Sequence, residues 1–545
     1  MSSTFGTITT VRLGIYASQK GLDVTGNNIT NINTNGYTRQ RLDQISLVVS
    51  ASDKYGSQYK ARVGQGPVIT GISQLRDPGM DISYRKANSD VGSADQMLAG
   101  LEDLAGILDE VGKGDGEQDD GVILNQLNDL RDLINQALTN GIENYEGSIR
   151  ASANALCTQF HQYAKALEGL MEDYETQLDE DTTRVNQILT ELRDLNLQIR
   201  NSDVRGDAAL ELRDQRNLLL DELSGYMKID VTYKMVDAGG GYMVEEMSVK
   251  LADRPADDPV YLVQGQYAAQ ISVKDQNGDF VPNYNITVSG LTNKDNEPHP
   301  TNPQTATTLG DNDLYGSLQS LRELLTEEGE YASKDDIDNV DGNAASKRGI
   351  PYYINQLNSL ARTFAEEMNE LNMPNDGTGN PPLDGEGALF ETNDNTTDIT
   401  AGNICISQEW AEGTVKMLST TDPNAPTDDR SNLAQFLNLF NRKDIEFDPK
   451  DIVGDAEGAV YEGSFESMLL RIESTLAQDQ MAATTTVNNY AITLNNVYTD
   501  RDSVTGVDLN DEATSLMVYQ KAYTAACRVL TTLEEAIDSL LAATA

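Results

Sequence analysis

The chain has 545 residues, and its 87 acidic against 40 basic side chains give a formal net charge of −47. This excess argues against binding to nucleic acid or to an anionic membrane, because both carry charge of the same sign. The length is sufficient for several domains, and no apolar run is long enough to predict a transmembrane helix. Residues 1–7 lack the charged and apolar segments of a secretory leader, which taken alone favours a cytoplasmic location. Adaptation to a salty or acidic medium is an alternative reason for the acidity.

The first predicted element is a helix with one narrow apolar seam, followed by a turn rich in asparagine. Apolar residues recur every seven positions along the helix, at Ile8, Ile15, Leu22 and Ile29. In the turn over residues 26–40, asparagine side chains can hydrogen bond to their own backbone. A seam this thin cannot form a domain core alone, so it requires a partner helix. An ordinary helix that ends in an Asn-rich turn fits the periodicity equally well.

Mixed strand and loop character over residues 42–86 gives way to long helices. Apolar spacings of three and four residues predict helices over 91–108 and 123–138, and a longer one over 145–200. A continuous helix over 145–200 would be roughly 80 Å long at 1.5 Å per residue, which is typical of a rod or coiled coil. Residues 207–223 follow as a helix with many charged side chains.

From about residue 228 to 312 the apolar period changes to two, which predicts strands. The Asn277-Gly278 pair predicts a hairpin turn, and we expect this segment to be a β domain inserted into the helical body. Asp275, Asn277 and Asp279 also have the first spacings of a calcium loop. No glutamate follows at the twelfth position, so we predict no metal site there.

Helical spacing returns over 313–372 and again after a loop over 373–403 that is rich in Gly, Pro and Asp. Near the C-terminus, residues 505–512 supply an N-cap and early acidic side chains for a final helix. Its seam positions, spaced mostly by four and three residues, include Leu509, Leu516, Gln520, Tyr523, Leu530, Ile537 and Leu540. Two seamed helices at opposite chain ends are what one antiparallel terminal coiled coil requires.

Residues suited to catalysis or metal binding are scarce. The histidines, His161 and His299, have no cysteine or carboxylate at ligand spacing. The cysteines, Cys157, Cys405 and Cys527, form neither a disulfide framework nor a metal pattern. No catalytic triad or phosphate-binding glycine loop can be assembled from the sequence. We therefore predict no enzymatic activity, no cofactor and no metal.

Both chain ends resemble one family, the bacterial flagellar axial proteins, which comprise rod, hook and hook-associated proteins. Residues 22–39, Leu-Asp-Val-Thr-Gly-Asn-Asn-Ile-Thr-Asn-Ile-Asn-Thr-Asn-Gly-Tyr-Thr-Arg, resemble its N-terminal signature, with Thr30 where Ala or Ser is commoner. Residues 505–513 and the Tyr-Gln-Lys-Ala-Tyr segment at 519–523 resemble its C-terminal signature. The Leu-Arg-Asp-Gln-Arg segment within 207–223 is typical of the hook-associated protein 1 branch, and rod and hook proteins lack it.

The resemblance implies a mainly α fold with a flagellin-like layout, in which both ends of the chain build a long coiled-coil or bundle body around an inserted all-β domain. The expected segments are an N-terminal axial coiled-coil helix with the Asn-rich motif at 1–41, a helical rod body at 42–227, the β domain at 228–312, the returning helical body at 313–500 with a loop and β segment at 373–464, and a C-terminal axial coiled-coil helix at 501–545.

The resemblance further implies a structural protein of the flagellum that forms the junction zone between hook and filament and allows the filament to assemble. Such a protein is secreted through the flagellar type III export apparatus with an uncleaved N-terminal signal. The implied partners are further copies of the chain in a ring, hook protein, a second hook-associated junction protein and a cytoplasmic export chaperone, with no nucleic acid and no membrane insertion. Another axial protein of the hook or rod, and an extracellular adhesin on a helical stalk, are the alternatives.

The residues expected to make assembly contacts come from the two terminal signatures and the seams beside them. They are Ile8, Ile15, Leu22, Asn27, Asn28, Ile29, Asn31, Gly36, Tyr37, Leu509, Leu516, Gln520, Tyr523, Leu530, Ile537 and Leu540.

Overall fold

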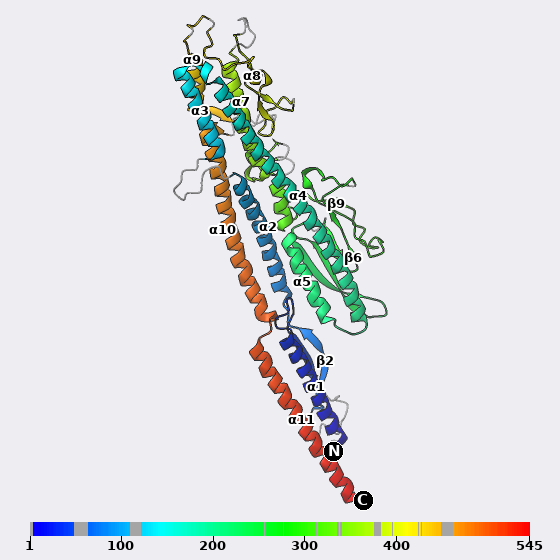
Figure 1. Cartoon of the computed structure of the whole chain (residues 1–545). Helices are drawn as coiled ribbons and strands as arrows, with labels where there is room; N and C mark the ends of the chain where they lie inside the picture. Colours follow the sequence, from blue (N-terminus) through cyan, green and yellow to red (C-terminus); the bar gives the residue numbers. More distant parts are fainter. Residues whose placement is uncertain are drawn as a thin grey trace.

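The computed structural model describes residues 4–47, 64–108, 121–255, 257–275, 277–310, 313–334, 337, 341–374, 383–394, 396–422, 424–426, 428–447 and 461–544. These residues form a long, narrow molecule that is mostly helical and carries small sheets (Figure 1). Both chain ends lie at the same tip of the molecule (Figure 1). The prediction of a mainly helical chain is confirmed.

The tip that holds both chain ends consists of two antiparallel helices and a small hairpin. Helix α1 (Thr4–Thr30) lies beside α11 (Leu509–Thr544). Strand β1 (Gln40–Ser46) pairs antiparallel with β2 (Pro67–Gln74), and both strands pack against α1. The two helices approach closely at Gly21, because a Cβ at this position would lie 2.5 Å from the ring of Tyr519.

The body beyond the tip is a bundle of long helices. Helices α2 (Pro78–Leu108) and α10 (Phe465–Thr505) lie side by side, and α5 (Leu210–Tyr226) and α6 (Gly316–Thr326) pack on α2. None of the helices in the described part of the chain is long and apolar enough to cross a membrane.

The predicted long helix over 145–200 is α4 (Glu146–Val204), which packs against α2, α3 (Val122–Asn140) and α5. Its 59 residues span about 90 Å at 1.5 Å per residue. One face is buried at spacings of three and four residues, and this face includes Leu156, Phe160, Leu167, Leu178, Val185 and Leu192. Each large side chain buried there contributes about 1.5–3 kcal/mol, so tertiary packing rather than intrinsic propensity maintains so long a helix.

Two small antiparallel sheets pack on α4. The first has the order β3-β4-β5-β6, formed by β3 (Ile229–Asp237), β4 (Met243–Leu251), β5 (Tyr261–Gln264) and β6 (Tyr267–Ala268). The second has the order β7-β8-β9, formed by β7 (Ile271–Ser272), β8 (Thr287–Val288) and β9 (Thr307–Thr308). The amide of Asn186 on α4 donates to the carbonyl of Ile271 and accepts from its N–H, both at 2.8 Å. The inner faces of both sheets share one apolar core with the helices.

The predicted hairpin around Asn277 is confirmed by an antiparallel bridge between Lys274 and Phe280. The Asp275 carboxylate accepts hydrogen bonds from the backbone N–H groups of Asn277 and Asp279, so the loop uses this carboxylate to close its own turn. Within the described ranges, no group of three or more His, Cys, Asp or Glu side chains is arranged to hold a metal ion.

The end of the molecule opposite the two termini is built from shorter elements (Figure 1). Aromatic side chains pack together there. The elements at this end are α7 (Ile350–Asn372), α8 (Gln408–Glu412) and α9 (Ser431–Leu439), with β10 (Phe390–Thr392) paired to β11 (Ile404–Ile406) and β12 (Ile445–Phe447) paired to β13 (Tyr461–Gly463). The ring of Phe364 makes edge contacts with Phe390, Phe440 and Phe465. Trp410 is fully buried beside them, and its indole N–H donates to Glu146 at 2.7 Å.

Replacing Gly92 with alanine is expected to destabilise the body by about 1–3 kcal/mol, because the new Cβ would overpack the contact between α2 and α5. That Cβ would lie 2.5 Å from the carbonyl oxygen of Gly225, a backbone atom that cannot rotate away. Gly106→Ala on the same helix is the matched control. Its Cβ would meet nothing within 4 Å, so it should stabilise by about 0.5–1 kcal/mol. Urea unfolding measures both, and equal effects would contradict the close approach at Gly92.

Candidate assembly site between the terminal helices and the body

The two terminal helices face each other along a seam of small and polar residues rather than large apolar ones. On α1 the buried residues are Ala17, Ser18, Gly21, Val24, Thr25 and Asn28. The predicted heptad residues of α1, Ile8, Ile15, Leu22 and Ile29, are only half-buried at the margin of this seam. Small side chains on the inner face let the helices approach, and the larger apolar side chains remain partly accessible from outside.

Helix α11 packs against α1 through only some of the residues predicted for its seam. Leu516, Leu530 and Ile537 are half-buried, and they alternate with the covered positions Glu512, Tyr519, Ala526 and Leu533. The other predicted residues of this helix, Leu509, Gln520, Tyr523 and Leu540, are exposed. The structure therefore brings the first three together with α1 and leaves the other four on the outer surface. As contacts with neighbouring subunits, all of these residues remain predictions.

Asn28 organises the Asn-rich turn. Its side-chain amide donates to the carbonyl of Gln40 at 2.9 Å, and its oxygen accepts from the backbone N–H of Gln40 at 2.9 Å and the hydroxyl of Tyr37 at 2.8 Å. Asn31 donates to the backbone and side-chain oxygens of Asn27, at 3.0 and 2.9 Å. Burial, together with nearby carboxylates led by Asp214, raises the pKa of Tyr37, so its hydroxyl stays protonated as a donor. The buried amide of Asn28 thus holds the end of α1 against the start of β1.

Gly36 adopts a left-handed backbone conformation in the Asn-rich turn. Its φ is +77°, and an ideal Cβ there would lie 3.5 Å from the side chain of Leu218 on α5. The positive φ is what favours glycine here, because glycine adopts it without strain, whereas 3.5 Å is an ordinary van der Waals distance.

Arg39 ties the turn to the C-terminal helices. Its backbone N–H donates to the carbonyl of Thr505, the last residue of α10, at 2.9 Å. Its guanidinium donates to Glu512 in the first turn of α11 at 2.7 Å and lies 3.8 Å from Asp511. The carboxylate of Glu512 is buried, with a side-chain exposure of 4%. A charge-assisted bond at such a site is stronger than a solvent-exposed pair, so Arg39 fixes how α11 leaves α10.

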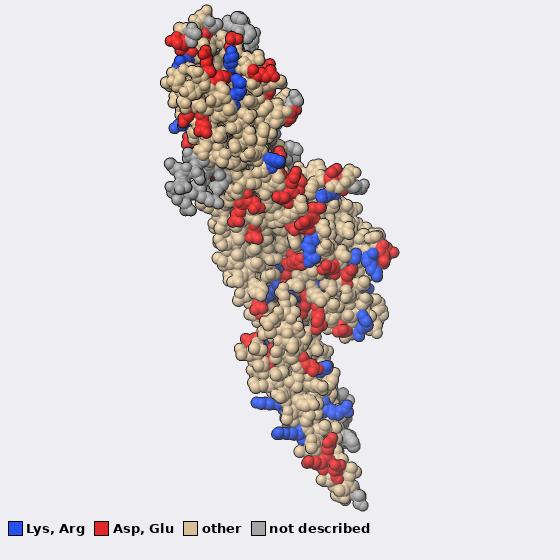
Figure 2. Space-filling view, viewed as in Figure 1, with Lys and Arg blue, Asp and Glu red and all other residues tan. Residues whose placement is uncertain are grey.

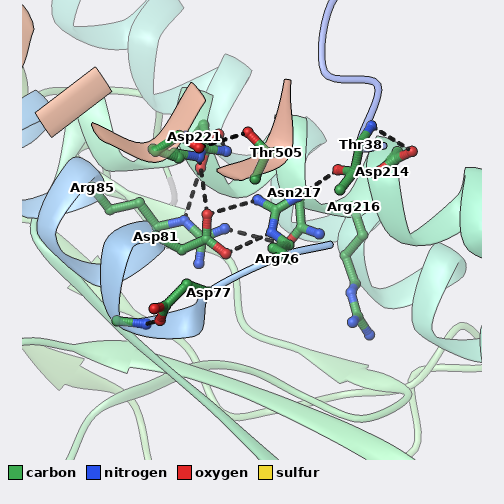
Figure 3. Close-up of polar contacts among 12 residues, drawn as sticks. Thr38, Arg76, Asp77, Asp81, Arg85, Asp214, Arg216, Asn217, Asp221 and Thr505 are labelled. Carbon is green, nitrogen blue, oxygen red and sulfur yellow. Dashed lines mark hydrogen bonds and ion pairs between the residues drawn. The ribbon is translucent and has the colours of Figure 1, made fainter. Parts of the chain in front are cut away.

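Beside this contact lies a group of five charged residues that we call the arginine cluster: Arg76, Asp81, Arg85, Asp221 and Arg501. Arg76 contacts Asp81 at 2.5 Å, and Arg85 contacts Asp221 at 2.9 Å. Arg501 bridges the two carboxylates, at 3.0 Å to Asp81 and 2.6 Å to Asp221. The cluster joins the segment before α2 with α2, α5 and α10, and Figure 3 shows Arg76, Asp81, Arg85 and Asp221 converging.

The cluster continues toward the Asn-rich turn through Thr38. The hydroxyl of Thr38 accepts from Arg76 at 3.2 Å, and its backbone N–H donates to Asp214 on α5 at 3.2 Å (Figure 3). Polar contacts therefore run without a break from α1 through the turn to the body, so the terminal pair is oriented by the body rather than merely attached to it.

Helix α5 supplies the body's side of this contact, and the sequence did not reveal that role. Helix α5 carries four polar residues at spacings of three and four, which therefore share one face: Asp214, Asn217, Asp221 and Ser224. Three of them are buried, and Asp221 is nearly so. These four polar residues recur at the spacing of a buried helix face, and that pattern is the signal in the sequence that could have identified the site.

Replacing Asp214 with asparagine is expected to raise stability at pH 7 by up to about 3 kcal/mol and to leave it unchanged near pH 4. Burial raises the pKa of Asp214 to about 6, above the ordinary value of 3.8, despite opposing hydrogen bonds from Thr38. The folded chain therefore holds this proton more tightly than the unfolded chain. Stability from the group is present below pH 4 and is lost as pH rises through about 6.

Thermal unfolding midpoints of the parent chain and Asp214→Asn, measured across that pH range, test this expectation. The asparagine keeps an oxygen that can accept from Thr38, so the variant isolates the charge. A constant difference between the two chains from pH 4 to pH 7 would show that the carboxyl does not titrate as its burial requires.

A polar groove of about 720 Å³ lies between the Asn-rich turn and the connection from α10 to α11. Asn33 and Asn35 line one wall, and Asp502, Asp508 and Asp511 line the other. Arg39 also lines the groove and supplies a positive charge. The site as a whole is a structural joint with an open polar margin.

Two sequence comparisons find similarity to flagellar hook-associated proteins. Residues 122–381 match the family model described as "Flagellar hook-associated protein FlgK helical domain". The chain is 25% identical over 567 aligned residues to flagellar hook-associated protein 1 of Bacillus subtilis (strain 168), across 99% of this chain and 98% of that protein. The solved structure of the flagellar hook junction protein FlgK from Burkholderia pseudomallei aligns with 57% of this chain and 46% of its own, at 20% identity and a TM-score of 0.39.

The helical-domain match lies within the body, and the sequence similarity extends over both terminal signatures. The chain is thus similar over nearly its whole length to flagellar hook-associated protein 1, and this similarity indicates a structural protein of the flagellum rather than an enzyme.

Proposed function

We propose that this protein forms the junction zone between the flagellar hook and the filament, and that the filament assembles on it. The observation that carries the proposal is the joint just described, in which both chain ends pair and are locked to the body through Arg39 and the arginine cluster. A subunit that connects two different tubes must hold its terminal pair at a fixed orientation, because that pair sets the register with its neighbours.

The layout supports contact with several neighbours at once. Copies of the chain would form a ring, with hook protein below and a second hook-associated junction protein above. The half-buried margin of α1, at Ile8, Ile15, Leu22 and Ile29, and the outer residues of α11 offer apolar area to these neighbours. The segments at 1–41, 42–227, 228–312, 313–500 and 501–545 would act as axial helix, body, outward-facing β domain, returning body and axial helix, with the two axial helices forming a coiled coil.

Secretion through the flagellar type III apparatus follows from the same role, because the ring lies outside the cell. Before export, a cytoplasmic chaperone would cover α11, whose residues Met517 and Val518 are 52% and 58% exposed. Exposed apolar side chains on one helix are a liability for a monomer in the cytoplasm, and a chaperone removes it.

Deleting the gene and examining the cells by electron microscopy, with an assay of flagellin in the medium, tests the proposal. Hooks without filaments, and flagellin shed as monomer, are the expected result. Cells without hooks would instead indicate a rod or hook component. Cells with intact filaments would exclude an axial role and favour an adhesin.

A further inference from the structure

One exposed helical surface of this very acidic protein carries no charge. Residues 480–499 of α10, which we call the uncharged band, contain no Asp, Glu, Lys or Arg. Since 23% of the chain is charged, twenty residues at that fraction would hold about five such side chains. Figure 2 shows uncharged surface along much of the flank where α10 runs.

The band faces away from the rest of the subunit. Helix α10 packs on α2 through positions spaced by three and four residues, among them Ala483, Val487, Leu494 and Val497, which are half-buried. The opposite side presents Met481 and Ile492, which are 71% and 62% exposed. Large apolar side chains therefore stand in solvent on a surface without charges to keep it soluble.

Hydrogen bonding within the helix makes this surface inexpensive to dehydrate. The hydroxyls of Thr484, Thr485, Thr486, Thr493 and Thr499 each donate to the carbonyl four residues earlier, at 2.8–3.0 Å. Burying a hydroxyl whose donor is already satisfied avoids the cost of an unpaired polar group. Each threonine methyl then adds apolar area to the surface.

We propose that the uncharged band is a lateral contact between two copies of this chain in the assembled ring; this inference rests on the proposed function. The net charge of −47 makes two copies repel wherever acidic faces meet, and the band is a surface where they can approach without that repulsion. A second uncharged stretch, residues 513–520 of α11, follows after the charged connection at 500–512. Nucleic acid and anionic lipid are unsuited occupants, because the band offers them no cation.

The size of the band explains why the contact requires the ring. Twenty helical residues span about 30 Å, and one face about 10 Å wide gives roughly 300 Å². A stable dimer in solution buries about 800 Å² on each partner, so this contact alone leaves the dilute chain monomeric. In the ring, the terminal helices already hold neighbouring chains in place. Each band therefore meets its neighbour at a high effective concentration, which compensates for the small contact area.

Photo-crosslinking in assembled flagella tests the inference. Ile492 is replaced by the photoreactive residue p-benzoyl-phenylalanine, and isolated flagella are irradiated and probed for this chain. The expected product has twice the 59.5 kDa of one chain, about 119 kDa. The same replacement at Asn154, an exposed position on α4, is the matched control and should give at least about tenfold less of that product.

Each other outcome has a distinct meaning. A product that contains hook protein or another flagellar protein, no product at all, or an equal yield from Asn154 would overturn the inference while the chain remains at the junction. Absence of the chain from isolated flagella would instead count against the proposed function itself.

A charge placed in the band gives an independent test. Ile492→Glu should lower the amount of chain in isolated flagella by at least about tenfold, because like charges opposite each other across a contact are strongly disfavoured. Asn154→Glu should not lower it. Since Ile492 is 62% exposed, the isolated variant should keep the circular dichroism of the parent chain. Normal incorporation of Ile492→Glu would contradict the inference.

Discussion

Replacing Asp221 with alanine is expected to destabilise the protein by about 3–5 kcal/mol, because it leaves a buried charge without its carboxylate partner. The side chain of Arg85 is 4% exposed, and Asp221 at 2.9 Å is its ion-pair partner. After the substitution Arg85 retains a hydrogen bond to Asn217 at 3.3 Å, which carries no compensating charge. Arg501 would lose one of its two carboxylates at the same time and retain Asp81.

The neighbouring residue supplies the control. Glu222, also on α5, pairs with Arg184 on α4, but their side chains are 36% and 34% exposed. Glu222→Ala should therefore cost less than about 1 kcal/mol. Urea unfolding followed by far-ultraviolet circular dichroism compares the two variants. Losses of similar size would mean that the arginine cluster does not hold α2, α5 and α10 together.

Replacing Leu516 with aspartate is expected to abolish filament attachment and motility while the body remains folded. Leu516 is half-buried between α11 and α1, one turn from the buried carboxylate of Glu512. A second carboxylate there meets both desolvation and like-charge repulsion, so the terminal pair should separate. The body has its own core, so its unfolding midpoint should change little.

Thr514→Asp is the matched control for the terminal pair. Thr514 is exposed, and it occupies the same heptad position as the exposed residues Lys521 and Arg528. A charge there remains in water, so swimming and filaments should be normal. Motile cells carrying Leu516→Asp, with filaments of normal number, would refute the role of the terminal pair.

The sequence was a good guide where one face of an element is buried against a large core. Helix α4 was predicted to within a few residues, because its apolar side chains recur at spacings of three and four and most of them pack inward. The hairpin at Asn277 was also predictable, because an Asn-Gly turn between strands has few alternatives.

The register of the terminal helices was harder to predict. A seam of alternating three- and four-residue spacings can be drawn through either of two adjacent helix faces. The structure covers Glu512, Tyr519 and Ala526 and leaves exposed three residues that the sequence pattern suggested, Leu509, Gln520 and Tyr523. The buried side of α1 is small and polar, so hydrophobicity alone pointed to its margin instead.

The arginine cluster could not be predicted from sequence patterns, for a different reason. Its members lie on the segment before α2, on α2, on α5 and on α10, far apart in a chain where acidic residues are abundant. Only the fold selects Asp81 and Asp221 from 87 acidic residues as the buried partners of three arginines. The spacing of polar residues on α5 hinted at a buried polar face but named no partner.

Immunogold labelling of intact flagella tests the central claim most directly. A short epitope can be inserted at Gly240, in the exposed turn between β3 and β4, where an insertion disturbs no buried contact. We expect gold only in the narrow zone between hook and filament, on every flagellum that carries a filament. Label along the hook, along the filament or over the cell surface would contradict the assignment of this chain to the junction.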